Sequence, residues 1–413
     1  MGSGRGVASS SAGAKAKGAA RAAPPAAASS SCIYLDWNAT TPVYPEVARE
    51  MTALLGCWGN PSSSHALGRP AKEAVDLGRE RVAKLINAAP GEIRFTSCGT
   101  ESDNWAIYAG VKRARLAGVA MPHVVTSNIE HPAVVEALKA FREDGLLEYT
   151  EVAVDSEGLL PLDAVAAAFR DETVLVSVMH SNNEIGALQP IAAIAELAHE
   201  RGAVLHTDAA QSLGKVDVDV KALGVDLLTV VGHKFGAPKG VAALYVSEAL
   251  GDDFPSFLHG GGQEGGLRAG TENVLMIAGL GKAAEIAHEE RAAIQDNMRA
   301  RTAQLEALLR AGLPGAEVRT NGPRDAARRL PNTLSLSIDG LRASAVLAEL
   351  SEEVAASAGA ACHTGAASIS SVLAAIGLEE RFAFGTLRLS VGRSTTEADV
   401  AEAARRILAK VRL

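Results

Sequence analysis

The chain has 413 residues, of which 47% are hydrophobic, and a formal net charge of −8 at pH 7. This length is enough for a large core and for more than one domain. A negative net charge argues against nucleic-acid binding, because nucleic-acid-binding proteins usually present a basic surface. No apolar run approaches the roughly 20 residues that a membrane helix needs. We therefore expect neither a nucleic-acid partner nor a membrane partner.

The four cysteines lie far apart in the sequence and form no CxxC pair. Such spacing favours reduced thiols in an intracellular compartment over a disulfide framework or a structural zinc site. His206 has no ligand partner at a suitable spacing, so we interpret it as a packed strand residue rather than a metal ligand. The sequence therefore predicts no metal site.

Residues 1–31 consist almost entirely of Ala, Ser and Gly, with four basic residues and no acidic one. Nothing in this stretch can fill a core, and its composition is typical of a disordered extension. A basic, serine-rich and acid-free beginning is also typical of an organellar transit peptide. We expect disorder and a cytoplasmic protein, with import into a mitochondrion or plastid as the alternative.

From residue 33 onward, apolar strands and helices alternate, which predicts an α/β fold with a mostly parallel sheet. The strand candidates are apolar along nearly their whole length, as expected for a sheet covered on both faces. The predicted strands are 93–97, 123–127, 174–180, 203–209, 227–233 and 241–246. The predicted helices between them are 101–114, 132–141, 162–169 and 190–201.

The pattern changes after a long helical stretch that runs from about residue 274 to residue 310. Beyond it we predict strands at 333–338 and 386–392 and helices at 344–350 and 397–411. We therefore expect a large domain over 32–310 and a smaller C-terminal α/β domain over 311–413. An early helix near residues 45–56 could pack on either domain.

Polar clusters follow several predicted strands, where ligands collect in α/β sheets. In "SCGTESD" (97–103), small residues and a threonine at the start of a helix could bind a phosphate through backbone N–H groups. A capping box, with Thr100 as the cap and Asp103 in place of the usual glutamate, is the alternative. Asp208 ends another strand, where it could face a protonated pyridinium nitrogen or simply cap a helix.

Lys234 follows a buried strand 26 residues after Asp208. A lysine in such a place is costly unless it is neutralised, paired or covalently used. A Schiff base with an aldehyde cofactor uses the amine and removes the cost of its charge. Phosphate loop, strand-end aspartate and strand-end lysine, in this order, together predict a pyridoxal 5'-phosphate (PLP) site.

The sequence resembles the cysteine desulfurase and selenocysteine lyase family of class-V aminotransferases, which are fold-type I PLP enzymes. The resemblance covers most of the chain, from residue 33 to residue 400. It rests on "IYLDWNATTP" (33–42), "FTSCGTESDN" (95–104), "EHPAV" (130–134), "MHSNNEIGALQPI" (179–191), "HTDAAQSLGK" (206–215), "VGHKFGAPKG" (231–240), "HGGGQEGGLRAGTEN" (259–273), "SAGAACH" (357–363) and "LRLSVGRSTTEADV" (387–400). It implies a large domain with a seven-stranded sheet and a smaller C-terminal domain.

The resemblance also implies roles around the cofactor ring. Lys234 would form the Schiff base and move the proton between the substrate Cα and the cofactor. Asp208 would pair with the pyridinium nitrogen, and Gln211 would donate a hydrogen bond to the phenolic oxygen. His131 would stack on the ring face as a further catalytic residue, and Asn183 would lie near the ring oxygen.

Further implied roles concern the phosphate, the substrate and the neighbouring subunit. Gly99, Thr100 and His233 would bind the phosphate. Thr271 would reach the phosphate of a second subunit, which implies a homodimer. Two residues match the substrate site, Arg388 as the clamp on the substrate carboxylate and Asn38 as part of the lining.

Cys362 lies in a small-residue loop that is poorly suited to a core, although a packing cysteine is the alternative. The family has its catalytic cysteine here, where it attacks or protonates the leaving chalcogen. The segments "AACH", "LRLSVGRSTT", "MIAGLGKAAE" (276–285) and "VGHKF" resemble selenocysteine lyases more closely, so we expect L-selenocysteine to be converted to L-alanine and selenide. The alternatives are a cysteine desulfurase that forms a persulfide on Cys362 for a sulfur-acceptor protein, and an inactive scaffold with the same fold.

Overall fold

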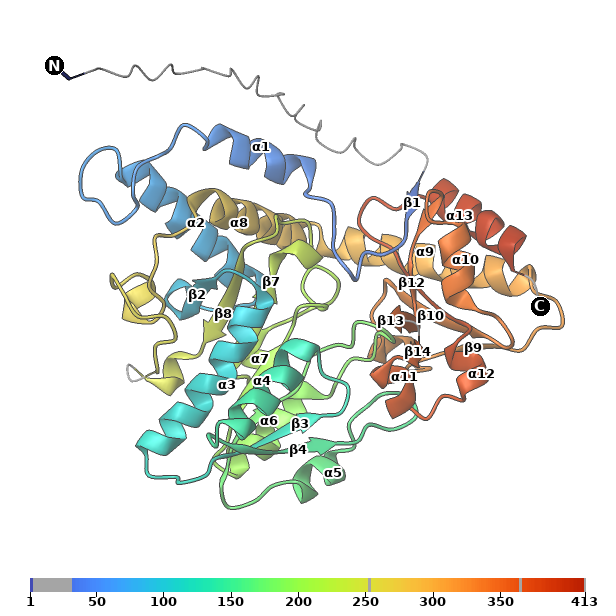
Figure 1. The fold of residues 1–413 in the computed structure, drawn as a ribbon, viewed down its shortest axis with the longest axis horizontal. Coiled ribbons are helices and arrows are strands. Elements are labelled where there is room, and N and C mark those ends of the chain that lie inside the picture. Colours follow the sequence, from blue (N-terminus) through green and yellow to red (C-terminus); the bar gives the residue numbers. More distant parts are fainter. Residues whose placement is uncertain (3–31, 252–253, 364–365, 412–413) are drawn as a thin grey trace.

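The computed structural model describes residues 1–2, 32–251, 254–363 and 366–411. Figure 1 shows a large sheet with helices around it and a smaller α/β part that carries the C-terminus. The predictions for residues 1–31 concern a segment that, apart from residues 1–2, lies outside the described residues. Among the described residues, no helix combines the length and hydrophobicity required to span a membrane.

The large sheet has seven strands in the order β2-β8-β7-β6-β5-β3-β4. β8 runs antiparallel to both of its neighbours, and the other neighbouring pairs are parallel. This confirms the predicted fold class and the mostly parallel seven-stranded sheet. The strands are β2 (Ile93–Thr96), β3 (His123–Ser127), β4 (Glu148–Val152), β5 (Thr173–Ser177), β6 (Val204–Asp208), β7 (Leu227–Val231) and β8 (Ala242–Val246).

Helices cover this sheet on both faces, so neighbouring strand residues enter different cores. Val176 and Leu205 belong to the main cluster, whereas Val124 and Leu175 belong to a second cluster beneath α3 and α4. Burial on both sides explains why these strands read as continuous apolar runs. The helices of this part are α1 (Pro45–Ala53), α2 (Arg69–Leu85), α3 (Gly99–Leu116), α4 (Pro132–Glu143), α5 (Leu162–Ala167), α6 (Ile191–Glu200), α7 (Val220–Leu223) and α8 (Val274–Glu289).

The smaller part is built on an antiparallel sheet in the order β12-β15-β10-β9. A hairpin of β13 and β14 and a short parallel pair of β1 and β11 accompany it. The strands are β1 (Ile33–Tyr34), β9 (Val318–Thr320), β10 (Thr333–Ile338), β11 (Val354–Ala355), β12 (Ser357–Ala358), β13 (Ala360–His363), β14 (Ala366–Ile369) and β15 (Thr386–Ser390). The helices are α9 (Arg291–Ala311), α10 (Ala343–Glu349), α11 (Ser371–Ala375), α12 (Glu380–Ala383) and α13 (Glu397–Lys410).

The core of the smaller part also draws on residues outside 311–413. Leu35 and, from α9, Ile294 and Leu305 pack in the same cluster as Leu336 and Leu389. A domain boundary at residue 310 therefore stays a prediction, and this packing groups α9 with the C-terminal sheet. The early helix α1 packs against α8, and Val47 of α1 lies in the main cluster.

The predicted helix over 274–310 is two helices, α8 and α9, which meet at Glu290. Glu290 departs from helical geometry, with φ −99° and ψ 8°, and its carboxylate pairs with Arg393 at 2.8 Å. No proline or glycine marks this break in the sequence. The edge strand β4 was also not predicted, because its residues are mostly exposed or half-buried and include two glutamates.

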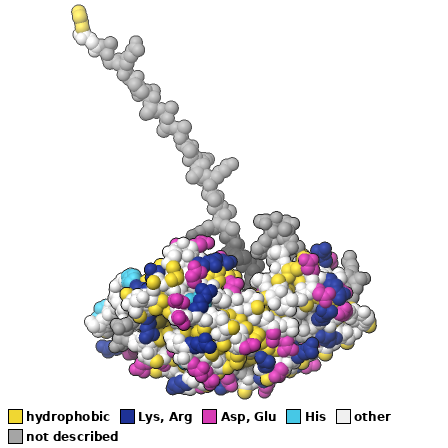
Figure 2. Space-filling view, turned by 90° about the horizontal axis from the view of Figure 1, so that it is seen from below, with side chains coloured by type: hydrophobic (Ala, Val, Ile, Leu, Met, Phe, Trp, Pro, Cys, Tyr) yellow, Lys and Arg dark blue, Asp and Glu magenta, His cyan; other side chains and the backbone are white. Residues whose placement is uncertain are grey.

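Figure 2 shows acidic and basic side chains mixed over the face of the molecule seen from below, with hydrophobic side chains between them. Neither sign of charge dominates this face. Such a surface gives no extended basic patch there for a phosphate backbone.

The close contact between α2 and α8 yields a first prediction. A Cβ atom at Gly281 would lie 2.6 Å from the Cα atom of Gly78. Gly281→Ala should therefore destabilise the protein by about 1–3 kcal/mol, although alanine favours helices over glycine. Urea unfolding would measure this, with Gly91→Ala as the control, because a Cβ at Gly91 meets nothing within 4 Å. A stabilised Gly281→Ala protein would contradict the packing described here.

Candidate active site

A cavity of about 260 Å³ lies at the carboxyl ends of β5, β6 and β7. Parallel strands bring their carboxyl ends to one edge of a sheet, so residues far apart in the sequence meet there. Eight of the predicted site residues line this cavity: Gly99, Thr100, His131, Asn183, Asp208, Gln211, His233 and Lys234. The predicted cofactor site is thus one contiguous space.

Asp208 is the last residue of β6, and its side chain faces the cavity from a buried position. Its Oδ1 accepts a hydrogen bond of 2.8 Å from the backbone N–H of Ala210. Turns rather than a helix follow, so the alternative of a helix cap is not realised. Burial raises the pKa of Asp208, because a desolvated carboxylate is costly. A cationic ligand group would remove this cost.

Lys234 ends the short turn Gly232–Lys234 directly after β7. Its Nζ donates to the backbone carbonyl oxygens of Asn38 and Ala39, each at 2.9 Å. Burial lowers the pKa of Lys234 to about 8, although Asp208 acts in the opposite direction. An amine with this pKa is far closer to its neutral, nucleophilic form at physiological pH than an exposed lysine is.

The start of α3 borders the cavity on the side predicted to bind a phosphate. Cys98 is the N-cap residue and no side chain caps the helix, so the capping box of Thr100 and Asp103 is absent. A Cβ atom at Gly99 would lie 2.6 Å from Cγ2 of Val231, so glycine allows this close approach of helix and strand. The uncapped N–H groups and the positive end of the helix dipole suit an anion.

Two histidines border the same cavity. Nδ1 of His131 accepts a hydrogen bond of 3.1 Å from Ala133 N, which assigns the proton to Nε2 when the ring is neutral. Partial desolvation lowers the pKa of His131, and burial lowers that of His233 to about 4. Nδ1 of His233 lies 3.0 Å from Oγ1 of Thr40. Both rings are therefore neutral near pH 7.

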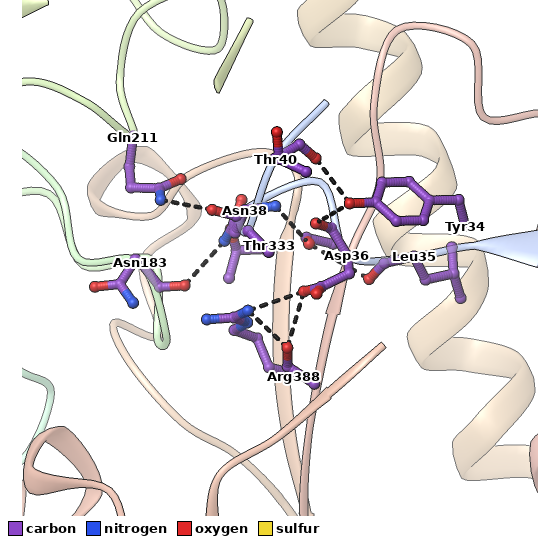
Figure 3. A network of polar contacts seen from close by, with 12 residues as sticks. Tyr34, Leu35, Asp36, Asn38, Thr40, Asn183, Gln211, Thr333 and Arg388 are labelled. Carbon is purple, nitrogen blue, oxygen red and sulfur yellow. Dashed lines mark hydrogen bonds and ion pairs between the residues drawn. The ribbon is translucent and has the colours of Figure 1, made fainter. Parts of the chain in front are cut away.

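Asn38 joins the large sheet to the C-terminal sheet (Figure 3). Its backbone carbonyl accepts from Nε2 of Gln211 at 2.9 Å in addition to Lys234. Its Nδ2 donates to the carbonyl of Asn183 at 3.1 Å and to Oγ1 of Thr333 at 2.8 Å. The predicted substrate-site residue thus lies beside the cavity as a buried structural link.

Arg388 of β15 lies on the side of the C-terminal sheet that approaches the cavity. Its Nη2 donates to Oδ1 of Asp36 and to Oγ of Ser357, both at 2.8 Å (Figure 3). Its Nε is buried and has no hydrogen-bond partner among the described residues. A buried donor without a partner is costly, and a ligand carboxylate would satisfy it.

Of the remaining two predicted residues, only Thr271 has a described side chain, and it does not line the cavity that contains Lys234. Thr271 is exposed and borders a separate cavity of about 200 Å³ with Arg268. Cys362 lies in β13, opposite Ala367 of β14, and its side chain lies outside the described residues. The residue after this hairpin contacts the turn that follows β5, because Oγ of Ser370 donates to Oε2 of Glu184 at 2.5 Å.

Two further residues at the site, Asp36 and Lys215, were not predicted from the sequence. Asp36, which holds Arg388, reads as an ordinary polar residue after a short apolar stretch. Lys215 is only 2% exposed, yet it could have been found by the same reasoning as Lys234, since it interrupts a segment of small and apolar residues. His206 is a packed strand residue, as predicted, with its ring nitrogens 2.9 and 3.1 Å from the hydroxyls of Ser177 and Thr229.

The groups around the cavity fit PLP. A buried carboxylate at Asp208 suits the protonated ring nitrogen, the amine of Lys234 suits the aldehyde, and the uncapped start of α3 suits the phosphate. The described residues contain no group of three or more His, Cys, Asp or Glu side chains that could hold a metal ion.

The model of the class-V aminotransferase family matches residues 33–402, most of the chain. The chain belongs to the class-V aminotransferase family. A protein from Clostridium botulinum named cysteine desulfurase IscS is 42% identical to this class-V aminotransferase over 374 residues, which are 89% of this chain and 91% of that protein. The enzyme is therefore PLP-dependent and related to cysteine desulfurases.

Solved structures agree with this family. A NifS-like protein has a TM-score of 0.83 and 34% identity, covering 92% of this chain and 98% of that one. A structure of SspA in complex with cysteine has a TM-score of 0.74 and 34% identity, covering 88% of this chain and 99% of that one. None of these three relatives is named a selenocysteine lyase, so the expected preference for selenocysteine stays a prediction.

Glu130, next to His131, gives a prediction on pH dependence. Its carboxyl accepts from Ser127 Oγ and from the backbone N–H of Met179, and burial raises its pKa to about 8. Since the folded-state pKa exceeds the unfolded one, the stability contributed by Glu130 is full at acidic pH and is lost as pH rises through about 8.

We expect the wild-type protein to lose stability relative to Glu130→Gln at about 1.4 kcal/mol for each pH unit between pH 5 and 8. Urea unfolding of both proteins across this range would measure the difference. Glu136→Gln, on the exposed side of α4, is the matched control. A difference between wild type and Glu130→Gln that does not change with pH would show that Glu130 is ionised in the folded protein.

Proposed function

We propose that this class-V aminotransferase is a cysteine desulfurase, which removes sulfur from L-cysteine and leaves L-alanine. The proposal is supported chiefly by the 42% identity to proteins named cysteine desulfurase over nine-tenths of the chain. The cavity that contains Asp208 and Lys234, together with Arg388 beside it, is consistent with an amino-acid substrate.

In the proposed reaction, Arg388 binds the substrate carboxylate through its unpartnered Nε and the rest of its guanidinium group. This contact fixes the amino acid with its Cα near Lys234. When bound, PLP supplies an electron sink for the negative charge that develops at Cα. Asp208 would keep the ring nitrogen protonated, and the neutral ring of His131 would lie against the cofactor ring.

Lys234 acts as the base that removes the proton from Cα and later returns a proton to the substrate. Its lowered pKa of about 8 leaves a useful fraction of the amine neutral near pH 7.5. The carbonyl groups of Asn38 and Ala39 hold the amine when it is not bound to the cofactor. These contacts and the lowered pKa support both proposed roles of Lys234, which are binding the cofactor and moving the proton at Cα.

Cys362 acts as the nucleophile toward sulfur. Its thiolate attacks the substrate sulfur, the bond between Cβ and sulfur breaks, and the sulfur stays on Cys362 as a persulfide. The electron pair left on the carbon skeleton takes up protons to give alanine. A reductant or the thiol of an acceptor protein then removes the persulfide sulfur. The link from Ser370 to Glu184 would fix the end of the hairpin that carries Cys362.

Selenocysteine lyase activity is the second candidate, favoured by "AACH", "VGHKF" and "MIAGLGKAAE". Sulfur and selenium differ too little in size for a pocket to discriminate strongly between the two substrates. The two activities are therefore distinguished by measuring the release of sulfide and of selenide. An inactive scaffold is disfavoured by the presence of Lys234, Asp208, Cys362 and Arg388 together. We also propose a homodimer, in which Thr271 reaches the phosphate of the second subunit. The proposed location of the enzyme is the cytoplasm.

The purified, PLP-loaded protein should form alanine and sulfide from L-cysteine in the presence of a reductant. Cys362→Ala should lose at least a hundredfold of this activity and retain PLP, because only the sulfur-accepting group is removed. Cys57→Ala is the matched control. Alanine, sulfide and selenide would be quantified with L-cysteine and with L-selenocysteine. Selenide release far above sulfide release, and unchanged in Cys362→Ala, would instead identify a selenocysteine lyase.

A further inference from the structure

Lys215 is a buried lysine that the proposed reaction does not use. It is 2% exposed and lies four residues after Gln211, in the turn that follows β6. Its amine donates to amide oxygens rather than to a carboxylate, and burial lowers its pKa well below the usual range. The charged groups that act on it are the cations Lys234 and Arg388. Burying an amine beside other cations is costly, and only hydrogen bonds to its N–H groups can offset part of that cost.

The two hydrogen-bond partners of Lys215 are both residues of the site. Nζ donates to Oε1 of Gln211 at 2.7 Å and to Oδ1 of Asn38 at 3.0 Å. Two N–H donors are enough for these bonds, and a lysine amine has them in either protonation state. The arrangement therefore does not depend on whether Lys215 is charged.

The bond from Lys215, together with the backbone carbonyl of Asn38, orients the side-chain amide of Gln211. Because Lys215 donates, the oxygen of the amide must point toward it and the NH₂ group must point away. Nε2 of Gln211 accordingly donates to the backbone carbonyl of Asn38 at 2.9 Å. Its second N–H has no acceptor among the described residues, and Gln211 lines the cavity. A turned amide would present its oxygen there instead.

The same bonds fix Asn38. Its Oδ1 accepts from Lys215 and from Nδ2 of Asn332, the latter at 2.9 Å. The carbonyl of Asn38 is thereby held where it accepts from both Gln211 and Lys234. Lys215, Gln211 and Asn38 form a closed ring of three hydrogen bonds behind the cavity wall.

We infer that Lys215 is a positioning residue of the cofactor site. It fixes the amide of Gln211 so that an N–H faces the phenolic oxygen of PLP, and it holds the carbonyl of Asn38 beside Lys234. An N–H donor stabilises the ionised phenolic oxygen, whereas an amide oxygen in its place would repel it. This inference rests on the proposed placement of Gln211 against that oxygen.

The test is a pH titration of the visible absorption band of the PLP-loaded, full-length protein. Lys215→Met should raise the apparent pKa of this band by about one unit, because a hydrogen bond to a charged oxygen is worth about 1.5 kcal/mol or more. Gln211→Leu should raise it by a similar amount. The double variant should shift it no further than Gln211→Leu alone. Lys221→Met, at an exposed position of α7, should leave the titration unchanged.

The outcomes distinguish a failure of the role inferred for Lys215 from a failure of the placement of Gln211. A shift in Gln211→Leu without one in Lys215→Met would overturn the role of Lys215 and leave the placement of Gln211 intact. Additive shifts in the double variant would also overturn it, since Lys215 would then act by its charge alone. No shift in Gln211→Leu would refute the placement of Gln211 and, with it, the inference. Alanine formation, measured on the same samples, tests the proposed function independently of all three results.

Lys215→Gln replaces Lys215→Met in the pH titration if circular dichroism shows that Lys215→Met does not fold. Glutamine keeps a polar group in the site but no longer imposes one orientation on Gln211, because its own amide can donate or accept. A shift in the same direction is expected, and an unchanged titration would contradict the inference.

Discussion

The hydrogen bonds of Asn38 connect the parts of the molecule that must meet for any chemistry to occur. Its backbone carbonyl contacts Lys234 and Gln211 from the large sheet. Its side chain contacts Thr333 of the C-terminal sheet. The segment from Tyr34 to Thr41 thereby lies between the two sheets, and Arg388 is held by Asp36 of the same segment. The cavity that contains Lys234 and the proposed substrate clamp Arg388 are both held by this one piece of chain.

The site is also a place where the fold buries ionisable groups without an ion-pair partner within the described residues. Asp208 and Lys215 are buried, Lys234 is half-buried, and burial shifts the pKa of each toward its neutral form. The free energy for this desolvation comes from the large apolar cores on both sides of the sheet. A ligand with a ring cation, a phosphate and an aldehyde removes part of this cost, which couples cofactor binding to stability.

Much of this arrangement could be predicted from the sequence, and the reasons are physical. Strands buried on both faces are apolar throughout, and the polar residues directly after them had to meet at one sheet edge. Asp208 and Lys234 were predictable because a charged side chain after a buried strand is costly unless a partner or a ligand compensates its charge. The break between α8 and α9 was not, because it depends on the pairing of Glu290 with Arg393, more than 100 residues later. The role of Asp36 was hidden for the same reason, since its partner Arg388 lies at the other end of the chain.

Reduction of the PLP-loaded protein with borohydride, followed by mass spectrometry of its peptides, tests the central claim most directly. The reagent makes the bond between the cofactor and its lysine permanent. The account predicts one pyridoxyl group per chain, on Lys234, with none on the neighbouring buried Lys215. A label on Lys215, or no label on any lysine of a protein that has bound PLP, would contradict it.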